Sequence, residues 1–101
     1  MTRYRVRYAA KAEADLLRLF DFLAERDLDA ADRAIDAIEE SMSLLELSPF
    51  SCRKVEPGNP FLRELVIPFG RAGYIALFEI EPPDVVTIAA LRHQREDDYL
   101  G

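Results

Sequence analysis

Two helical stretches joined by almost no linker are the feature that most constrains how this chain folds. From Ala9 to about Arg26, leucine and phenylalanine recur at steps of three and four residues, the spacing of one face of an α-helix. After a short break at Arg26-Asp27-Leu28, with Asp29 as the expected N-cap, a second stripe begins. Because the linker is so short, the helices must fold back as an αα-hairpin whose apolar face needs another layer to cover it. The first stripe holds Leu16, Leu19, Phe20 and Leu23, and the second holds Ala31, Ala34, Ile35, Ile38, Met42 and Leu45.

The covering layer is predicted by β-type patterns on both sides of the hairpin. Residues 4–8 alternate aromatic or β-branched residues with arginines, which is typical of an edge strand with a charged outer face. Pro49 ends the second helix, and residues 51–60, rich in proline and glycine, are expected to form a loop. Three strands are then predicted, over Leu62–Ile67 (stopped by Pro68), Tyr74–Ile80 and Val85–Leu91. We therefore expect an α+β fold of order β-α-α-β-β-β, a helical hairpin on a mostly antiparallel four-stranded sheet, forming a single domain over residues 1–101.

Acidic residues are concentrated in the helices. Residues 12–47 hold eleven Asp and Glu against three Arg, a balance of −8, so the rest of the chain carries +2 of the net −6. On amphipathic helices such acids normally form the solvated face. The chain lacks the basic footprint of a nucleic-acid-binding protein, and we expect its acidic hairpin to face a basic protein surface.

Several kinds of site lack their sequence signatures. The chain has one cysteine, Cys52, and one histidine, His93, so neither a disulfide framework nor zinc-type spacing is present. No glycine-rich phosphate loop follows a strand, and no serine or cysteine lies in a nucleophile elbow. We therefore expect no cofactor and no metal. The apolar stretches are too short to span a bilayer and no signal peptide begins the chain, which predicts a cytoplasmic protein without a membrane partner.

One polar segment, Leu91–Tyr99, follows the most apolar predicted strand. Its arginines, with His93, are suited to binding phosphate or carboxylate groups. In an RNA-cleaving site, His93 or Tyr99 would transfer protons while the arginines stabilise the charge on phosphate. Arg63, on a neighbouring strand, is expected to converge on the same surface. The alternative is that these charges pair locally and only cap the sheet. Tyr4 and Tyr8 are expected to pack in the core or at its rim, and Phe20, Phe22 and Phe50 are expected to pack in the core.

Four segments together resemble toxins of the RelE/ParE superfamily, from type II toxin–antitoxin systems. They are RHQREDDY at 92–99, YRVRYAAKAEADLLRLFDFLAER at 4–26, LLELSPFSCRKV at 44–55 and LRELVIPFGRAGYIALFEIE at 62–81. They cover nearly the whole chain in the order of elements derived above. The chain departs at Cys52, where relatives often carry glycine.

The resemblance implies a toxin silenced by a cognate antitoxin that wraps the helical hairpin and the sheet. One branch of the superfamily inhibits DNA gyrase, and the other cleaves mRNA on the ribosome. Leu65 and Ile75 stand where RNA-cleaving relatives carry basic residues, so the resemblance favours a ParE-like gyrase inhibitor that is not an enzyme. Its target-binding surface is then expected to comprise Arg63, Arg71, Arg92, His93 and Arg95. The alternatives are an endoribonuclease that uses Arg63, His93 and Tyr99, and an inactive member that retains antitoxin binding.

Overall fold

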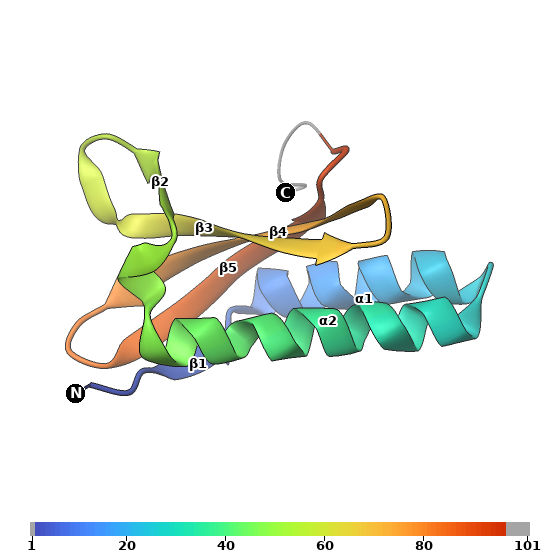
Figure 1. The fold of residues 1–101 in the computed structure, drawn as a ribbon, viewed down its shortest axis with the longest axis horizontal. Coiled ribbons are helices and arrows are strands. Elements are labelled where there is room, and N and C mark those ends of the chain that lie inside the picture. Colours follow the sequence, from blue (N-terminus) through green and yellow to red (C-terminus); the bar gives the residue numbers. More distant parts are fainter. Residues whose placement is uncertain (1, 97–101) are drawn as a thin grey trace.

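The computed structural model describes residues 2–96, in which two helices cover one face of a twisted sheet (Figure 1). In chain order the elements are β1 (Arg5–Tyr8), α1 (Ala10–Ala24), α2 (Leu28–Leu47), the 3-10 helix η1 (Pro49–Ser51), β2 (Arg53–Glu56), β3 (Asn59–Phe69), β4 (Ala72–Glu81) and β5 (Val85–His93). The strands lie in the order β1-β5-β4-β3-β2. β1 pairs with β5 in parallel, and the other described pairs are antiparallel. The α+β class, the helical hairpin and the mostly antiparallel sheet are confirmed, but the predicted count of four strands is wrong because the sheet has five.

The additional strand, β2, lies in the segment predicted to be a loop. It forms a hairpin with the start of β3, with Glu56 opposite Asn59, so Pro57 and Gly58 mark a tight turn. All four β2 residues are exposed, and the strand therefore has no alternation of apolar and polar residues by which to predict it. The same pairing explains why β3 begins at Asn59, before the predicted Leu62.

Other predicted boundaries also differ from the structure. The N-cap of α2 is Asp27, whose side chain accepts a hydrogen bond from the Ala30 N–H, while Asp29 lies within the helix. β3 continues through Pro68, which lies opposite Gly73, one residue pair before the ladder ends at Phe69 and Ala72, a position that tolerates proline. β5 extends beyond Leu91 to His93. None of the helices within residues 2–96 has the length and apolarity needed to cross a membrane.

The core lies between the hairpin and the helix-facing side of the sheet. Among its fully buried large side chains are Ile38 and Leu45 of α2 and Phe78 of β4. Tyr4 and Tyr8 pack against this core, as expected. Phe22 and Phe50 do not, since they are 58% and 44% exposed. The expectation that these two rings are core residues is therefore wrong.

A β-bulge in β5 decides which side chains face the helices at its end. Leu77 lies opposite Ala90 while Phe78 lies opposite Ile88, so Ala89 is an extra residue in β5. Beyond the bulge the alternation shifts by one, and the fully buried Leu91 faces the helices together with Ile88. His93 consequently lies on the helix side of the sheet and Arg92 on the opposite side.

Candidate functional site

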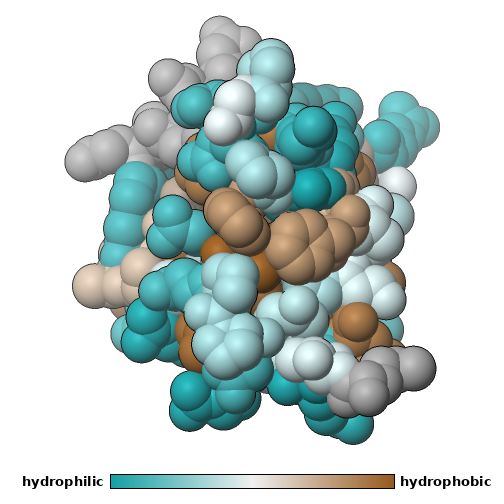
Figure 2. Space-filling model, turned by 90° about the vertical axis from the view of Figure 1, so that its left-hand side faces the viewer, coloured by the Kyte–Doolittle hydropathy of each residue, from teal (hydrophilic) through white to brown (hydrophobic). Residues whose placement is uncertain are grey.

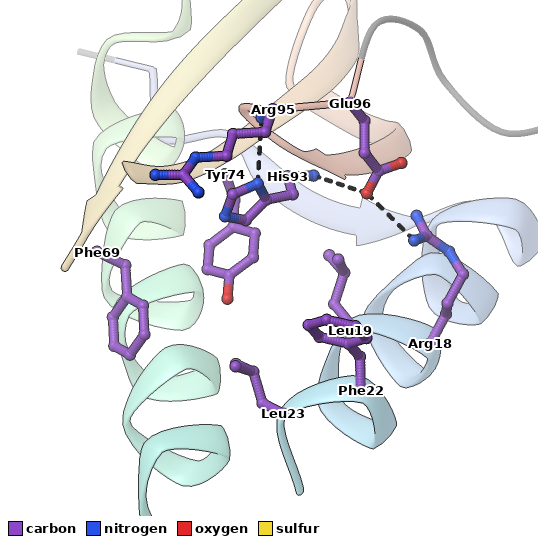
Figure 3. A pocket seen from close by; sticks show the side chains of 9 residues that line it. All are labelled: Arg18, Leu19, Phe22, Leu23, Phe69, Tyr74, His93, Arg95 and Glu96. Carbon is purple, nitrogen blue, oxygen red and sulfur yellow. Dashed lines mark hydrogen bonds and ion pairs between the residues drawn. The ribbon is translucent and has the colours of Figure 1, made fainter. Parts of the chain in front are cut away.

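A pocket of about 710 Å³ lies between α1 and the ends of β3, β4 and β5. Its floor is mostly apolar and its rim is charged (Figure 3). Figure 3 shows the α1 side chains forming one wall, with His93 and the Tyr74 ring facing them. We call it the His93 pocket, and it is lined by Arg18, Leu19, Phe22, Leu23, Phe69, Tyr74, His93, Arg95 and Glu96.

Local hydrogen bonds hold His93 in one orientation. Its ring meets Tyr74 edge-on, with centroids 5.6 Å apart. The ring Nδ1 accepts a hydrogen bond from the main-chain N–H of Arg95 at 3.1 Å. In the neutral ring the N–H therefore lies on Nε2, leaving that atom as a hydrogen-bond donor. Burial raises the pKa of the Tyr74 phenol, so this hydroxyl stays protonated beyond the usual pH range.

A chain of charges ties α1 to the turn that contains His93. Lys11 Nζ lies 2.9 Å from an oxygen of Asp15, and Arg18 Nη2 lies 3.8 Å from the other. Arg18 also contacts Glu96 Oε1 at 3.2 Å. The same Glu96 oxygen accepts the main-chain N–H of His93 at 3.1 Å. The position of the histidine thus depends on ion pairs that begin on the helix.

Asp15 is the residue of this site that the sequence reasoning missed. It is 5% exposed, and one carboxylate oxygen accepts the main-chain N–H of Leu91 at 3.0 Å. β1 pairs with β5 only as far as Tyr8, opposite Ile88, so beyond that point no strand among residues 2–96 lies beside this edge of β5. Asp15 bonds to this edge in place of a strand. A signal was present, because Asp15 lies three residues after Ala12 and four before Leu19, inside the apolar stripe of α1.

The C-terminal arginines divide into two kinds. The Arg92 guanidinium donates to the main-chain oxygens of His93 and Glu96, so it holds the turn closed from the outer side of the sheet. This agrees with the alternative in which the charges of this segment pair locally. Arg95 is exposed on the rim of the His93 pocket. Arg71 is exposed in the β3–β4 turn, at the same end of the sheet. Tyr99 lies outside the described residues.

Arg63 does not converge with His93, and that expectation is wrong. Arg63 lies opposite Phe78 of β4 and His93 lies opposite Tyr74, a separation of four residues along the strand. At 3.2–3.4 Å per residue the two levels are about 13 Å apart. The Arg63 guanidinium instead donates to three main-chain oxygens, those of Phe50, Cys52 and Pro60, at 3.0, 2.8 and 2.8 Å.

Arg63 therefore organises the opposite end of the molecule. Its guanidinium also lies 5.4 Å from the centre of the Phe50 ring, which packs edge-on against Phe61. Figure 2 views this end and shows apolar surface in the middle of a largely hydrophilic face. Burial raises the pKa of the neighbouring Cys52 thiol, so this cysteine is not an activated nucleophile.

Two positions that carry basic residues in RNA-cleaving relatives are apolar and buried here. Leu65 is 8% exposed and belongs to the core, and Ile75 is 6% exposed. Within residues 2–96, no three His, Cys, Asp or Glu side chains gather as a metal site requires. The His93 pocket therefore offers apolar contact, two hydrogen-bond donors on a histidine and an arginine, and a paired carboxylate.

Known proteins similar to this chain are toxins. The sequence model of the ParE toxin of the type II toxin–antitoxin system parDE matches residues 6–98. Toxin RelE3 of Caulobacter vibrioides is 37% identical over 92 residues, which cover 90% of this chain and 95% of that toxin. Toxin RelE1 of the same organism is 32% identical over 77 residues, covering 76% and 80%.

A solved structure shares the fold. It is a chain of the chromosomal ParDE toxin–antitoxin system from P. aeruginosa, and it superposes with a TM-score of 0.71 at 20% identity, covering 90% of this chain and 96% of that one. At this identity the structural likeness shows the fold alone. The family match covers nearly the whole sequence, and membership of a toxin–antitoxin family implies a cognate antitoxin as partner. The chain belongs to the ParE toxin family of type II toxin–antitoxin systems, within the RelE/ParE superfamily.

Proposed function

We propose that this chain is a toxin that inhibits DNA gyrase through protein–protein contact and is silenced by its cognate antitoxin. The observation that carries the proposal is how few free cations lie at the His93 pocket: of its two lining arginines, Arg18 is paired with Asp15 and Glu96, and Arg95 lies on the rim. Arg63 is bonded to main-chain oxygens at the other end of the sheet, and Ile75 is apolar and buried. Cleavage of RNA needs cations at the phosphate as well as a group that moves a proton.

The His93 pocket is better suited to a protein side chain than to RNA. Its apolar floor, with hydrogen-bond donors on the rim, has the composition of a protein-interface anchor site. Arg71, His93 and Arg95 lie at this end of the molecule and are the proposed contact residues, while Arg92 holds their turn in shape. The acidic hairpin, with its balance of −8, also opposes binding to ribosomal RNA.

The alternative is a ribosome-dependent mRNA endoribonuclease. It is favoured by the His93 ring, whose Nε2 is left as a donor while Arg95 lies beside it on the rim of the pocket. Two similar proteins also carry the name RelE. In this reading His93 and Tyr99 would serve proton transfer.

A supercoiling assay with purified gyrase tests the proposal. The folded chain should inhibit supercoiling, added antitoxin should relieve the inhibition, and Arg95→Ala should raise the half-inhibitory concentration about tenfold, the cost of losing one charged hot-spot contact. Lys54→Ala is the matched control, since it removes an exposed cation from β2 at the far end and should change nothing. If the chain, verified as folded by circular dichroism, leaves gyrase unaffected but cleaves mRNA on ribosomes, and His93→Ala abolishes cleavage, the alternative holds.

A further inference from the structure

The end of the molecule far from the His93 pocket carries an open sheet edge. β2 is the outermost strand in the sheet order, so its outer edge pairs with no strand among residues 2–96. All four of its residues are exposed, and Figure 1 shows the β2–β3 hairpin clear of both helices. The main-chain N–H and C=O groups along this edge are therefore open to pairing with another strand.

Two of the four β2 residues carry opposite charges that no described side chain neutralises. Lys54 and Glu56 have no ion-pair partner within residues 2–96, whereas Arg53 is paired with Glu64 at 3.0 Å. Alternation along the strand places Lys54 and Glu56 on one face and Val55, which is 39% exposed, on the other. The open edge thus presents a cation, an apolar side chain and an anion in succession.

Symmetry limits how β2 can pair with the same strand of a second copy. A two-fold axis through the sheet keeps every side chain on its own face, and residues directly opposite each other share a face. Antiparallel partners must therefore both have even numbers or both have odd numbers. Two such registers pair three β2 residues. One sets Lys54 opposite Lys54, and the other sets Val55 opposite Val55 with Lys54 opposite Glu56 on both sides of the axis.

We propose that two copies of this chain associate through β2, antiparallel, with Val55 on the two-fold axis. Each Lys54 then lies opposite the Glu56 of the other copy, so both uncompensated charges gain a counter-ion. The two Val55 side chains meet on the axis and bury apolar surface. Because the strand is so short, the interface belongs to the smallest class, and we expect a dissociation constant on the order of 100 µM.

The other edge of the sheet has the opposite charge pattern. β1 carries arginine at positions 5 and 7. Of its two-fold registers that pair three residues, one sets Arg5 opposite Arg7 and the other sets Arg7 opposite itself. Like charges directly opposite each other destabilise a strand pair. Of the two edges of the described sheet, β2 is therefore the one whose charges favour pairing with itself.

The charge order of β2 also favours a second copy over other strands. A strand of uniformly basic residues would meet a like charge at Lys54, and a uniformly acidic one would meet a like charge at Glu56. The His93 pocket is lined by residues at the other end of the sheet, so association through β2 leaves it open. This association does not depend on whether gyrase is the target.

Sedimentation of the purified free chain tests the association. Between about 10 µM and 1 mM, the measured mass should rise from the 11.5 kDa of one chain towards twice that value. In 0.5 M salt the association should weaken, because the paired charges lie at the surface. Backbone NMR signals of residues 54–56 should shift with concentration while those of His93 stay constant. A chain that remains monomeric at 1 mM, or shifts confined to the helices, would overturn the proposal.

Charge reversal tests the register. Lys54→Glu or Glu56→Lys should weaken the dimer about thirtyfold, because each change turns two ion pairs into like-charge contacts. The double variant Lys54→Glu/Glu56→Lys exchanges the charges and should restore association to within about threefold of the natural chain. Glu25→Lys, at an exposed residue beyond the far end of α1, makes the same charge change and should leave association unaltered. A double variant as weak as the single variants would contradict the register. All these side chains are exposed, so the variants are expected to fold, which circular dichroism verifies.

Hydrogen exchange identifies the edge that becomes covered. The amide protons of β2 should exchange more slowly in a 1 mM solution of the chain than in a 10 µM solution, and those of β1 should not change. Protection of β1 instead of β2 would place the interface on the other edge. Protection of β2 that requires added antitoxin would assign this edge to the antitoxin. Either result would overturn association through β2.

Discussion

The charged side chains on one side of α1 form ion pairs, and those on the other side do not. Toward the His93 pocket, Lys11, Asp15 and Arg18 form a connected set that continues to Glu96. On the other side of the hairpin, four acids have no ion-pair partners within residues 2–96: Glu13 and Asp21 of α1, and Asp32 and Glu39 of α2. A single helix thus bears structural charges on one side and uncompensated charges on the other.

This difference predicts that the paired charges stabilise the fold and that the unpaired charges act in binding. The connected charges are partly buried and bond to the main chain of β5 and its turn, so changing them should alter the free energy of unfolding. The unpaired acids lie in water and repel one another, so neutralising them should not destabilise the fold and should alter only what this side of the hairpin attracts. Each of the following substitutions tests one side of this division.

Asp15→Ala should have the largest effect, a loss of about 3 kcal/mol in the free energy of unfolding. The substitution removes a buried carboxylate, leaves the Leu91 N–H without its acceptor and strips Lys11 of its partner. Urea unfolding followed by circular dichroism measures the change. Asp29→Ala is the control, because Asp29 is 83% exposed in its pair with Arg33, and it should cost less than about 0.5 kcal/mol. Equal losses of unfolding free energy in both variants would contradict the division into structural and uncompensated charges.

The contact between Arg18 and Glu96 should contribute less. Their side chains are 36% and 22% exposed, so solvent screens the pair and we expect a coupling energy of about 1 kcal/mol. A double-mutant cycle with Arg18→Met and Glu96→Gln measures this energy. Because Glu96 also accepts the His93 N–H, the Glu96→Gln variant should shift the His93 ring signals in NMR spectra. Unmoved signals would mean that the charge chain does not position the histidine.

Local features of the sequence explain why much of the fold was predictable. The helical spacing in residues 9–47 and the turn residues after it act over a few positions, and they predicted the helical hairpin and three of the four strands that follow it. β2 was missed because its four residues are all exposed, so only its pairing with β3 makes it a strand.

The site depended on features that act at long range. The bulge at Ala89 sets the side on which His93 lies, and no residue type marks it in the sequence. Asp15 bonds to the edge of β5 because β1 ends at Tyr8, beyond which no described strand pairs with that edge. The register of β3 on β4 determines that Arg63 lies far from His93. The residue types thus predicted a polar segment at the end of β5, but the geometry of the site depends on how the strands pair, which the residue types do not show.

Alkaline pH should lower the free energy of unfolding through the phenol of Tyr74, which lines the His93 pocket. Burial raises the pKa of this phenol above its ordinary value near 10, so the folded state favours the neutral form. The resulting stability is fully present below pH 10 and is lost as the pH rises through the folded-state pKa. The free energy of unfolding, measured between pH 9 and 11, should fall less steeply with pH for Tyr74→Phe than for the natural chain. Tyr8, whose pKa burial also raises, is present in both proteins, so the difference isolates Tyr74.

Substitutions of two exposed acids on α2 should give the smallest changes in the free energy of unfolding, and these changes should have opposite signs. Asp36 has no ion-pair partner among the described residues and lies four residues from both Asp32 and Glu40, so Asp36→Asn relieves two like-charge contacts and should stabilise the fold by about 0.5 kcal/mol. Asp29→Asn breaks the pair with Arg33 and weakens the favourable charge at the helix start, so it should destabilise by a similar amount. Urea unfolding at low salt resolves both changes, and 0.5 M salt should shrink them because both interactions are exposed. If Asp36→Asn destabilised the chain as Asp29→Asn does, the outer acids would be structural too, and the division of the hairpin into a side with structural charges and a side with uncompensated charges would fail.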